Sequence, residues 1–180
     1  MREMVAPGPR RYLPAMVTIR AATPLDRESL GRLGAALMRQ HHAEDPRRFL
    51  HVEHPEEGYG RFLVSQLSSP DSLVMVAEHS GAVVGYVFAD LEPTSWMELR
   101  GPCGVVHDVY VDEPARRLGA GRELLRAAIA WIRSKGHSQV VLLTKTRNER
   151  AQRLFVALGF RPTMVEMTLD LDTGGTGEHG

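Results

Sequence analysis

The stretch RRLGAG, residues 116–121, combines positive charge with two glycines that flank one small residue. Arginine side chains attract anions, and glycine lets a phosphate approach the backbone without meeting a Cβ atom. Leu124, Leu125 and Ile132 follow at helical spacing, so the glycines stand where a helix begins. Backbone N–H groups at a helix start lack partners and carry the positive end of the helix dipole. The stretch therefore predicts a site for an anion, with a phosphate as the first candidate.

Two common phosphate-binding motifs do not fit this stretch. A dinucleotide-binding fingerprint needs a third glycine where this chain has Leu124, and a P-loop needs a Gly-Lys-Ser/Thr sequence that is absent here. The remaining pattern, Arg-x-x-Gly-x-Gly, is weak alone, because a similar pattern occurs by chance in roughly one chain of this length in five. A protein that binds ATP through this loop is one alternative that the motif leaves open.

Charge is balanced overall but unevenly distributed. The 180-residue chain has 22 basic and 22 acidic residues, which does not favour a nucleic-acid-binding protein. Residues 114–161 contain eleven basic and two acidic residues, whereas residues 41–60 contain five acidic and two basic residues. This asymmetry favours an anion bound by the C-terminal half and a cation near the acidic stretch, although solvated helix faces explain part of it.

Hydrophobic periodicity predicts one α/β domain over residues 16–171. We expect a mixed, mostly antiparallel central sheet flanked by helices, with residues 1–15 as a flexible extension and 172–180 as a disordered tail. Composition shows no signal peptide, membrane span or disulfide framework, so we expect a cytoplasmic protein. The expected strands are 17–22, 72–78, 83–90, 103–111, 139–146 and 164–171, and the expected helices are 23–45, 56–68, 119–134 and 148–158.

Two motifs in the right order carry a resemblance to a known family. VYVDEPARRLGAGRELL, followed by NERAQRLFVALGF, resembles the GNAT superfamily of acyl-CoA-dependent N-acyltransferases. The resemblance covers about residues 17–171. It implies a GNAT-like fold, acetyl-CoA as co-substrate, a primary amine as acceptor, and no metal. A non-catalytic acyl-CoA-binding module of the same fold is the alternative.

The resemblance also assigns roles to residues. Backbone amides from Arg117 to Arg122 would hold the CoA pyrophosphate. Pantetheine would pair with the strand that precedes them, as a peptide adds to a sheet edge, and Asn148 would hydrogen-bond it from the other side. Strands 103–111 and 139–146 would part to admit it. The residues implied to bind the co-substrate are Val109, Tyr110, Val111, Arg116, Arg117, Leu118, Gly119, Ala120, Gly121, Arg122, Asn148 and Phe155.

The groups that would transfer protons follow less directly from the two motifs. The family often places a proton-donating tyrosine where this chain has Phe155, which has no hydroxyl group. Strand alternation puts His107 on the face of Val109 and Val111, and its side-chain type suits a general base near neutral pH. His107 is therefore the candidate catalytic residue. A structural histidine satisfied by a carbonyl, Asp108 as base, or a chain of waters are the alternatives.

Three further patterns in the sequence give weaker indications of function. Cys103, His107 and Asp108 contain the residue types of an acyl-enzyme triad, but strand alternation predicts that Asp108 faces away from His107. His51 and His54 lack a third ligand at metal-binding spacing. Acidic residues between Glu44 and Glu57 could attract a cationic acceptor or lie on a solvated surface. The alternating residues 164–171 could pair with a neighbouring chain in a homodimer.

Overall fold

The computed structural model of this protein describes residues 16–171. The predicted extension 1–15 and tail 172–180 lie outside the described residues. The elements are, in chain order, β1 (Thr18–Ala21), a 3-10 turn η1 (Pro24–Asp26), α1 (Arg27–Glu44), α2 (Glu56–Gln66), β2 (Ser72–His79), β3 (Ala82–Glu92), β4 (Cys103–Val111), a second 3-10 turn η2 (Glu113–Ala115), α3 (Ala120–Ser134), β5 (Val140–Leu142) and α4 (Glu149–Ala157).

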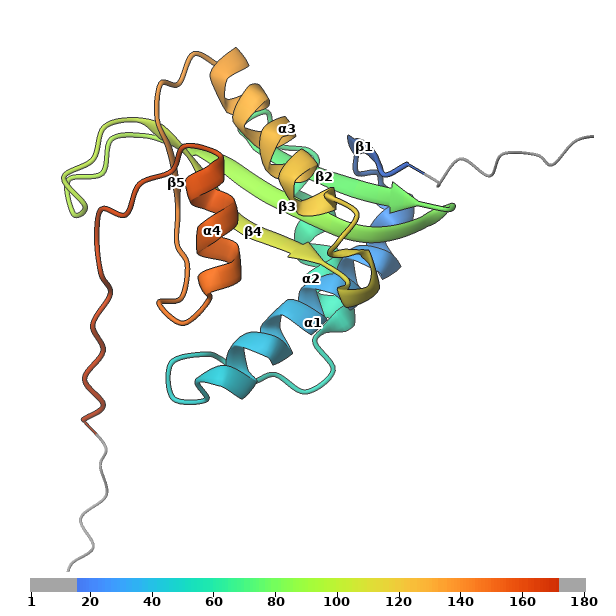
Figure 1. Cartoon of the computed structure of the whole chain (residues 1–180), viewed down its shortest axis with the longest axis horizontal. Coiled ribbons are helices and arrows are strands. Elements are labelled where there is room, and N and C mark those ends of the chain that lie inside the picture. The colour runs from blue at the N-terminus through green and yellow to red at the C-terminus, as the bar shows by residue number, and fades with distance from the viewer. Residues whose placement is uncertain (1–15, 172–180) are drawn as a thin grey trace, which may run out of the picture.

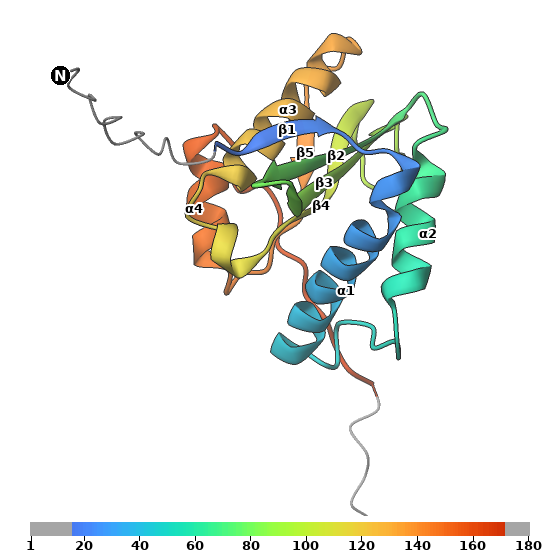
Figure 2. The ribbon, with the colours of Figure 1, turned by 90° about the vertical axis from the view of Figure 1, so that its right-hand side faces the viewer.

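The five strands form one sheet in the order β1-β2-β3-β4-β5. The first four are antiparallel to their neighbours, and β5 pairs with β4 in parallel. Helices α1 and α2 cover one face, and α3 and α4 cover the other (Figures 1 and 2). The expected mixed, mostly antiparallel sheet with flanking helices is therefore confirmed.

Each face of the sheet carries its own hydrophobic core. On the α3 side, Leu124, Leu125 and Ile132 are fully buried against strand residues such as Val87. On the α1 and α2 side, the core joins helix residues to Tyr86 and Phe88 of β3. Successive β3 residues alternate between these two cores, as the twofold period of a strand requires. The face to which a β4 residue belongs can therefore be read from the core that it joins.

The start of α1 is fixed by one buried carboxylate. Asp26 accepts two hydrogen bonds of 2.8 Å from the guanidinium of Arg20 and one of 2.8 Å from the backbone N–H of Thr23. The hydrogen bonds from Arg20 lower the pKa of Asp26 to about 2, against the cost of burial. This ion pair connects β1 to the turn before α1, and the same carboxylate accepts hydrogen bonds from the backbone N–H and the hydroxyl group of Thr23.

The C-terminal part of the sheet differs from the sequence prediction in two ways. The strand expected over 139–146 pairs only at Val140–Leu142, and the strand expected over 164–171 has no ladder at all. Instead, Arg48 forms an ion pair with Glu166, and Arg47 forms one of 3.4 Å with Asp170, so this segment runs beside the loop after α1. Alternation alone predicted a strand, but a ladder also needs a partner edge. The homodimer stays a prediction.

Replacing Asp26 by Asn tests the ion pair at the start of α1. A lowered carboxyl pKa contributes stability above about pH 4, which is lost as the pH falls towards 2. Because Arg20 is partly exposed, we expect the substitution to lower the free energy of unfolding by about 1 to 2 kcal/mol at pH 7. Urea denaturation at pH 7 and at pH 2.5 measures the difference, with exposed Glu28→Gln as the control. A destabilisation of equal size at both pH values would contradict this account.

Candidate functional site

The loop between β4 and α3 presents a set of unpaired backbone donors. The N–H groups of Arg117, Gly119, Ala120 and Gly121 donate to no acceptor in the part of the chain that the structure describes. Gly119 precedes the helix at a φ of 80°, a left-handed conformation that disfavours side chains. A Cβ atom built on it would meet no atom within 4 Å, so this side of the loop is open. The geometry fits the anion site that the sequence predicted.

The arginines of this loop have different roles. Arg116 stabilises the loop through contacts with β4. Its Nε donates to the carbonyl of Val111 at 2.9 Å, and its guanidinium lies over the ring of Tyr110. Arg117 and Arg122 form no ion pair with a carboxylate among residues 16–171. They leave positive charge uncompensated beside the open N–H groups. Leu118 is exposed in the same turn.

Strands β4 and β5 part beside this loop. The parallel pairing joins Gly104, Val105 and Val106 of β4 to β5 and ends there. Residues 107–111 of β4 therefore have β3 on one side and no strand on the other within the described residues. The unpaired edge, which includes Val109 to Val111, leads directly to the open N–H groups at the start of α3. The predicted parting of these strands is present.

Helix α4 closes this region from the other side. Asn148 caps α4 through its Oδ1, which accepts from the N–H of Ala151 at 3.2 Å, so its side-chain amide remains as a donor. Arg150 of α4 donates to the carbonyl of Arg116 at 3.3 Å, which brings the two sequence motifs together. Phe155 is buried in the core beside Phe160, with ring centroids 6.0 Å apart.

A bulge in β4 changes the face that His107 occupies. Phe88 of β3 pairs with Asp108 and Ala89 pairs with Val106, so His107 has no partner in the ladder. Its ring stacks on Phe88, which belongs to the α1 and α2 core, at 5.1 Å between centroids. The expectation that His107 shares a face with Val109 and Val111 is therefore wrong. A bulge places two residues opposite one and shifts the alternation that follows.

Because of the bulge, His107 and Asp108 both lie on the α1 and α2 face. The Nε2 of His107 is 3.5 Å from Asp90 and 3.9 Å from Glu92. The expectation that Asp108 faces away from His107 is thus wrong, but the separation of Cys103 and His107 along β4 still opposes a Cys-His-Asp triad. Cys103 is fully buried, and its sulfur contacts Arg100 rather than His107.

Asp108 holds two tyrosine hydroxyl groups that sequence reasoning missed. Tyr59 of α2 donates to its Oδ2 at 2.5 Å, and Tyr86 of β3 donates to the same oxygen at 3.0 Å. Burial, followed by the negative charge of Asp108, raises the pKa of both tyrosines above the ordinary value of 10.0. Both hydroxyls therefore remain protonated donors at neutral pH. The only signal in the sequence was tyrosine rather than phenylalanine at buried positions, which implies a polar partner.

A second histidine lies near this cluster. His41 of α1 is within hydrogen-bonding distance of the carbonyl of Leu37, 3.0 Å from its Nδ1. Burial and the charge of Lys145 lower the pKa of His41, so its ring is neutral at pH 7. Lys145, in the loop before α4, pairs with Glu44 of α1 at 2.6 Å, and this contact holds that loop against α1.

The acidic stretch between α1 and α2 is largely neutralised. Glu56 pairs with Arg39, and Glu57 pairs with Arg27 at 3.2 Å and with Arg61 at 3.3 Å. These carboxylates therefore contribute less to cation attraction than their number in the sequence suggests. Within residues 16–171 no three His, Cys, Asp or Glu side chains cluster as a metal site would require.

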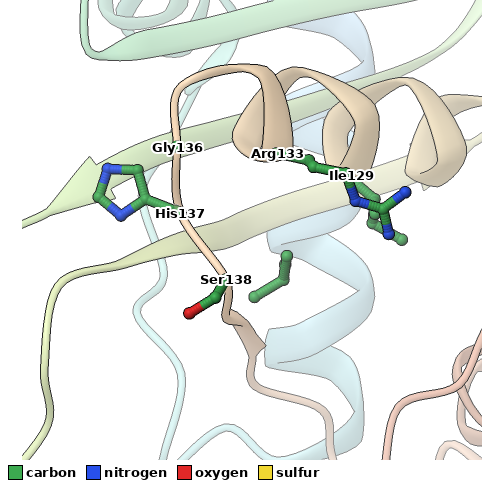
Figure 3. Close-up of a pocket in the computed structure, with 6 residues that line it drawn as sticks. Ile129, Arg133, Gly136, His137 and Ser138 are labelled. Carbon is green, nitrogen blue, oxygen red and sulfur yellow. The ribbon is translucent and has the colours of Figure 1, made fainter.

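Two hollows in the surface lie apart from the loop before α3. One is at the opposite end of α3, where Figure 3 shows Ile129 and Arg133 of the helix beside Gly136, His137 and Ser138 of the following loop. Because α3 separates it from the open N–H groups, it does not belong to the anion site. The other lies beside α2 and includes Tyr59 and Phe62. No helix between residues 16 and 171 is both long and apolar enough to cross a bilayer.

Comparison with known proteins agrees with this geometry. The chain is 32% identical to the mycothiol acetyltransferase of Thermobispora bispora over 175 residues, which is 92% of this chain and 54% of that protein. The chain thus spans about half the length of the mycothiol acetyltransferases that it matches.

Solved structures show the same fold. A tetramutant of the BH1408 protein from Bacillus halodurans superposes with a TM-score of 0.74 at 26% identity, covering 86% of this chain and 99% of that one. The aminoglycoside N-acetyltransferase AAC(6')-Iy, in complex with CoA, superposes with a TM-score of 0.67 at 18% identity, covering 88% and 97%.

A family model decides the assignment. The model of the acetyltransferase (GNAT) family matches residues 35–160, which include β4, the open loop, α3 and all of α4 with its cap. This range contains both motifs on which the sequence resemblance depended. The chain therefore belongs to the acetyltransferase (GNAT) family.

Proposed function

We propose that this protein transfers the acetyl group of acetyl-CoA to a primary amine by direct attack of the amine on the thioester. The observation that carries the proposal is the unpaired edge of β4 leading into four open N–H groups at the start of α3. A linear amide-containing arm that ends in a pyrophosphate matches this sequence of donors. Membership of an acetyltransferase family supports the same conclusion.

The chain's own residues supply binding and charge stabilisation. The N–H groups of Arg117, Gly119, Ala120 and Gly121 would hold the pyrophosphate, with Arg117 and Arg122 adding charge. The edge of β4 at Val109–Val111 would pair with the pantetheine arm, and the amide of Asn148 would donate from α4. A β4 N–H group would polarise the thioester carbonyl, where negative charge grows during attack.

We assign proton transfer to the face of β4 that is turned towards α1 and α2. Attack requires a neutral amine: its nitrogen forms the bond to the acetyl carbon, the carbon–sulfur bond breaks, and the displaced proton passes to a base. His107 stands on the bulge with Asp90 3.5 Å away, and we assign it this proton. Phe155 cannot protonate the thiolate, but a thiol pKa of about 8.5 makes that group a tolerable leaving group unaided.

The relatives point to one acceptor worth testing first. Several are named mycothiol acetyltransferases, so the amine precursor of mycothiol is a proposed acceptor. Because this chain spans about half the length of those relatives, membership of the family does not identify its acceptor. Other small primary amines belong in the same comparison.

A non-catalytic acyl-CoA-binding module is the rival function, and the phenylalanine at position 155 favours it. Both functions predict that CoA binds, so only turnover separates them. Purified protein should release CoA thiol from acetyl-CoA when incubated with at least one member of a panel of primary amines. The thiol is measured with a disulfide reagent, and protein without amine is the control. CoA binding without thiol release for any amine would support the module, whereas tighter binding of ATP than of CoA would contradict both.

Replacing Gly119 by Val tests the pyrophosphate site. A side chain at a φ of 80° strains the loop and projects into the open space over the N–H groups. We expect CoA affinity, measured by calorimetry, to fall roughly tenfold or more, the effect of losing charge-assisted hydrogen bonds.

Gly136 provides a matched control at the far end of α3. It also has a positive φ, of 86°, and open space around it, so Gly136→Val carries the same backbone strain away from the proposed site. It should retain CoA affinity. Equal loss of affinity in both variants would attribute the effect to strain rather than to blocked access.

Replacing His107 by Ala tests its role as base. Loss of a general base lowers kcat by about 100-fold or more, and the defect should shrink at high pH, where the amine loses its proton without help. A pH profile of kcat for His107→Ala and wild type measures this, with His137→Ala at the far end of α3 as control. A loss of the same size at every pH would give His107 a packing role. If His41→Ala alone shows the pH-dependent loss, the base is His41.

A further inference from the structure

The carboxylate of Asp108 is bound asymmetrically. Both tyrosine hydroxyls, from Tyr59 and Tyr86, donate to Oδ2, while Oδ1 accepts no hydrogen bond from residues 16–171. A carboxylate oxygen has room for two acceptor contacts, so Oδ1 keeps its full capacity. One half of the group is therefore fixed by the protein, and the other half is free to accept.

The chain makes room for this arrangement at the interface of α1 and α2. Gly34 of α1 lies against the ring of Tyr59, where a Cβ atom would come within 2.1 Å of the ring carbon Cδ1. The missing side chain lets the Tyr59 ring pass α1 and reach β4. Tyr86 is fully buried on β3 and comes from the neighbouring strand. The carboxylate is thus oriented by two side chains that cannot easily move.

Asp108 differs from carboxylates such as Asp26 and Glu44 in having no arginine or lysine partner. Asp26 is paired with Arg20, and Glu44 is paired with Lys145. Asp108 forms no ion pair with any arginine, lysine or histidine in the described ranges of the chain. Two neutral hydroxyl groups offset the desolvation of a carboxylate only in part, because a buried charge is stabilised best by an opposite charge. The missing cation is the counterpart that a ligand could supply.

The position of Asp108 says where that ligand would lie. The bulge turns Asp108 and His107 to the same face, directly before the unpaired edge at Val109–Val111. A cation at Oδ1 would therefore lie beside the proposed base and next to the β4 edge proposed for the thioester arm.

We propose that Oδ1 of Asp108 binds the acceptor as an ammonium ion, so that the acceptors are primary amines that are cationic at neutral pH. The proposal rests on the acetyl transfer proposed above, because it names the acceptor class of that site. Asp108 contacts the substrate, whereas Tyr59 and Tyr86 are positioning residues that fix its carboxylate. Weakly basic arylamines and alcohols of the same shape lack the charge and bind poorly.

The ammonium site can be tested by comparing how tightly the protein binds an amine and the alcohol of the same shape, under conditions in which no acetyl transfer occurs. Protein saturated with CoA, which carries no acetyl group, is titrated calorimetrically with benzylamine, 2-phenylethylamine and 1,4-diaminobutane, and with the alcohols of matching shape. At least one amine should bind roughly tenfold or more tightly than its alcohol, as expected for a charge-assisted hydrogen bond. In Asp108→Asn this preference should disappear.

Two further variants distinguish the contribution of the Asp108 carboxylate from that of the residues that orient it. Tyr59→Phe and Gly34→Ala retain the charge of Asp108 but loosen its orientation, so the amine should bind more weakly while remaining preferred over the alcohol. Asp71→Asn, before β2, is the matched control and should behave as wild type. Unchanged CoA affinity shows that each variant is folded.

The outcomes distinguish this proposal from the acetyl transfer itself. Equal affinity for amines and alcohols, binding of no amine, or a preference that persists in Asp108→Asn would overturn the assignment of Asp108, even if acetyl transfer occurs. Amine preference that depends on Asp108 in a protein without thiol release would support the ammonium site and contradict the transferase. If Asp108→Asn does not fold, weaker amine binding in Tyr59→Phe decides the case, because unchanged amine affinity in that variant would overturn the proposal.

Discussion

The early end of the pairing between β4 and β5 is the constraint on which the site depends. A sheet normally satisfies both edges of an interior strand, and unpaired N–H and C=O groups are costly when buried away from water. Here the ladder stops at Val106, and the next five residues of β4 keep one edge free beside an open loop. In the proposed function, a ligand arm completes the sheet at this edge, so the donor of the acetyl group would be recognised largely by backbone.

A single extra residue in β4, at the bulge, determines which side chains face α1 and α2. Without the bulge, His107 would join the core beneath α3, and only Asp108 would face α1 and α2. With it, two titratable side chains project from the same face, one stacked on Phe88 and the other held by two tyrosines. In the functions proposed above, the two co-substrates would approach β4 from different directions, with the anionic one at the start of α3 and the amine beneath α1 and α2. The cationic and anionic groups of the two ligands would then lie in separate surroundings.

Charge is arranged accordingly. Arg117 and Arg122, beside the start of α3, pair with no carboxylate among residues 16–171, whereas Glu56 and Glu57 near α2 are paired with arginine. Asp108 is the exception on its face, with hydroxyl donors in place of a cation. The contact between Lys145 and Glu44 joins the loop before α4 to α1, and thereby links the two sides of the molecule across the parted strands.

The sequence by itself determined the fold class and the family, and it located the glycine-containing loop that we propose as the anion site. These depend on local patterns: helical and strand periodicity, the glycines of RRLGAG at a helix start, and the cap at Asn148 all act over a few residues. The same local reasoning went wrong where pairing between distant segments decides the outcome. Residues 164–171 alternate as a strand should, but form no ladder, because alternation does not supply a partner edge.

Only the tertiary structure decided the face of His107, since a bulge depends on the register with β3 and leaves no local signature in CGVVHDVYV. It alone brought together Tyr59, Tyr86 and Asp108, which come from one helix and two strands. Hydrogen bonds between side chains so far apart in the chain depend on how the elements pack. The ring of Tyr59 reaches β4 only because Gly34 of α1 has no side chain in its way. The proposed anion site could be predicted from the sequence because a helix start offers its own backbone N–H groups, whereas the proposed amine site is built from side chains that meet only in the folded protein.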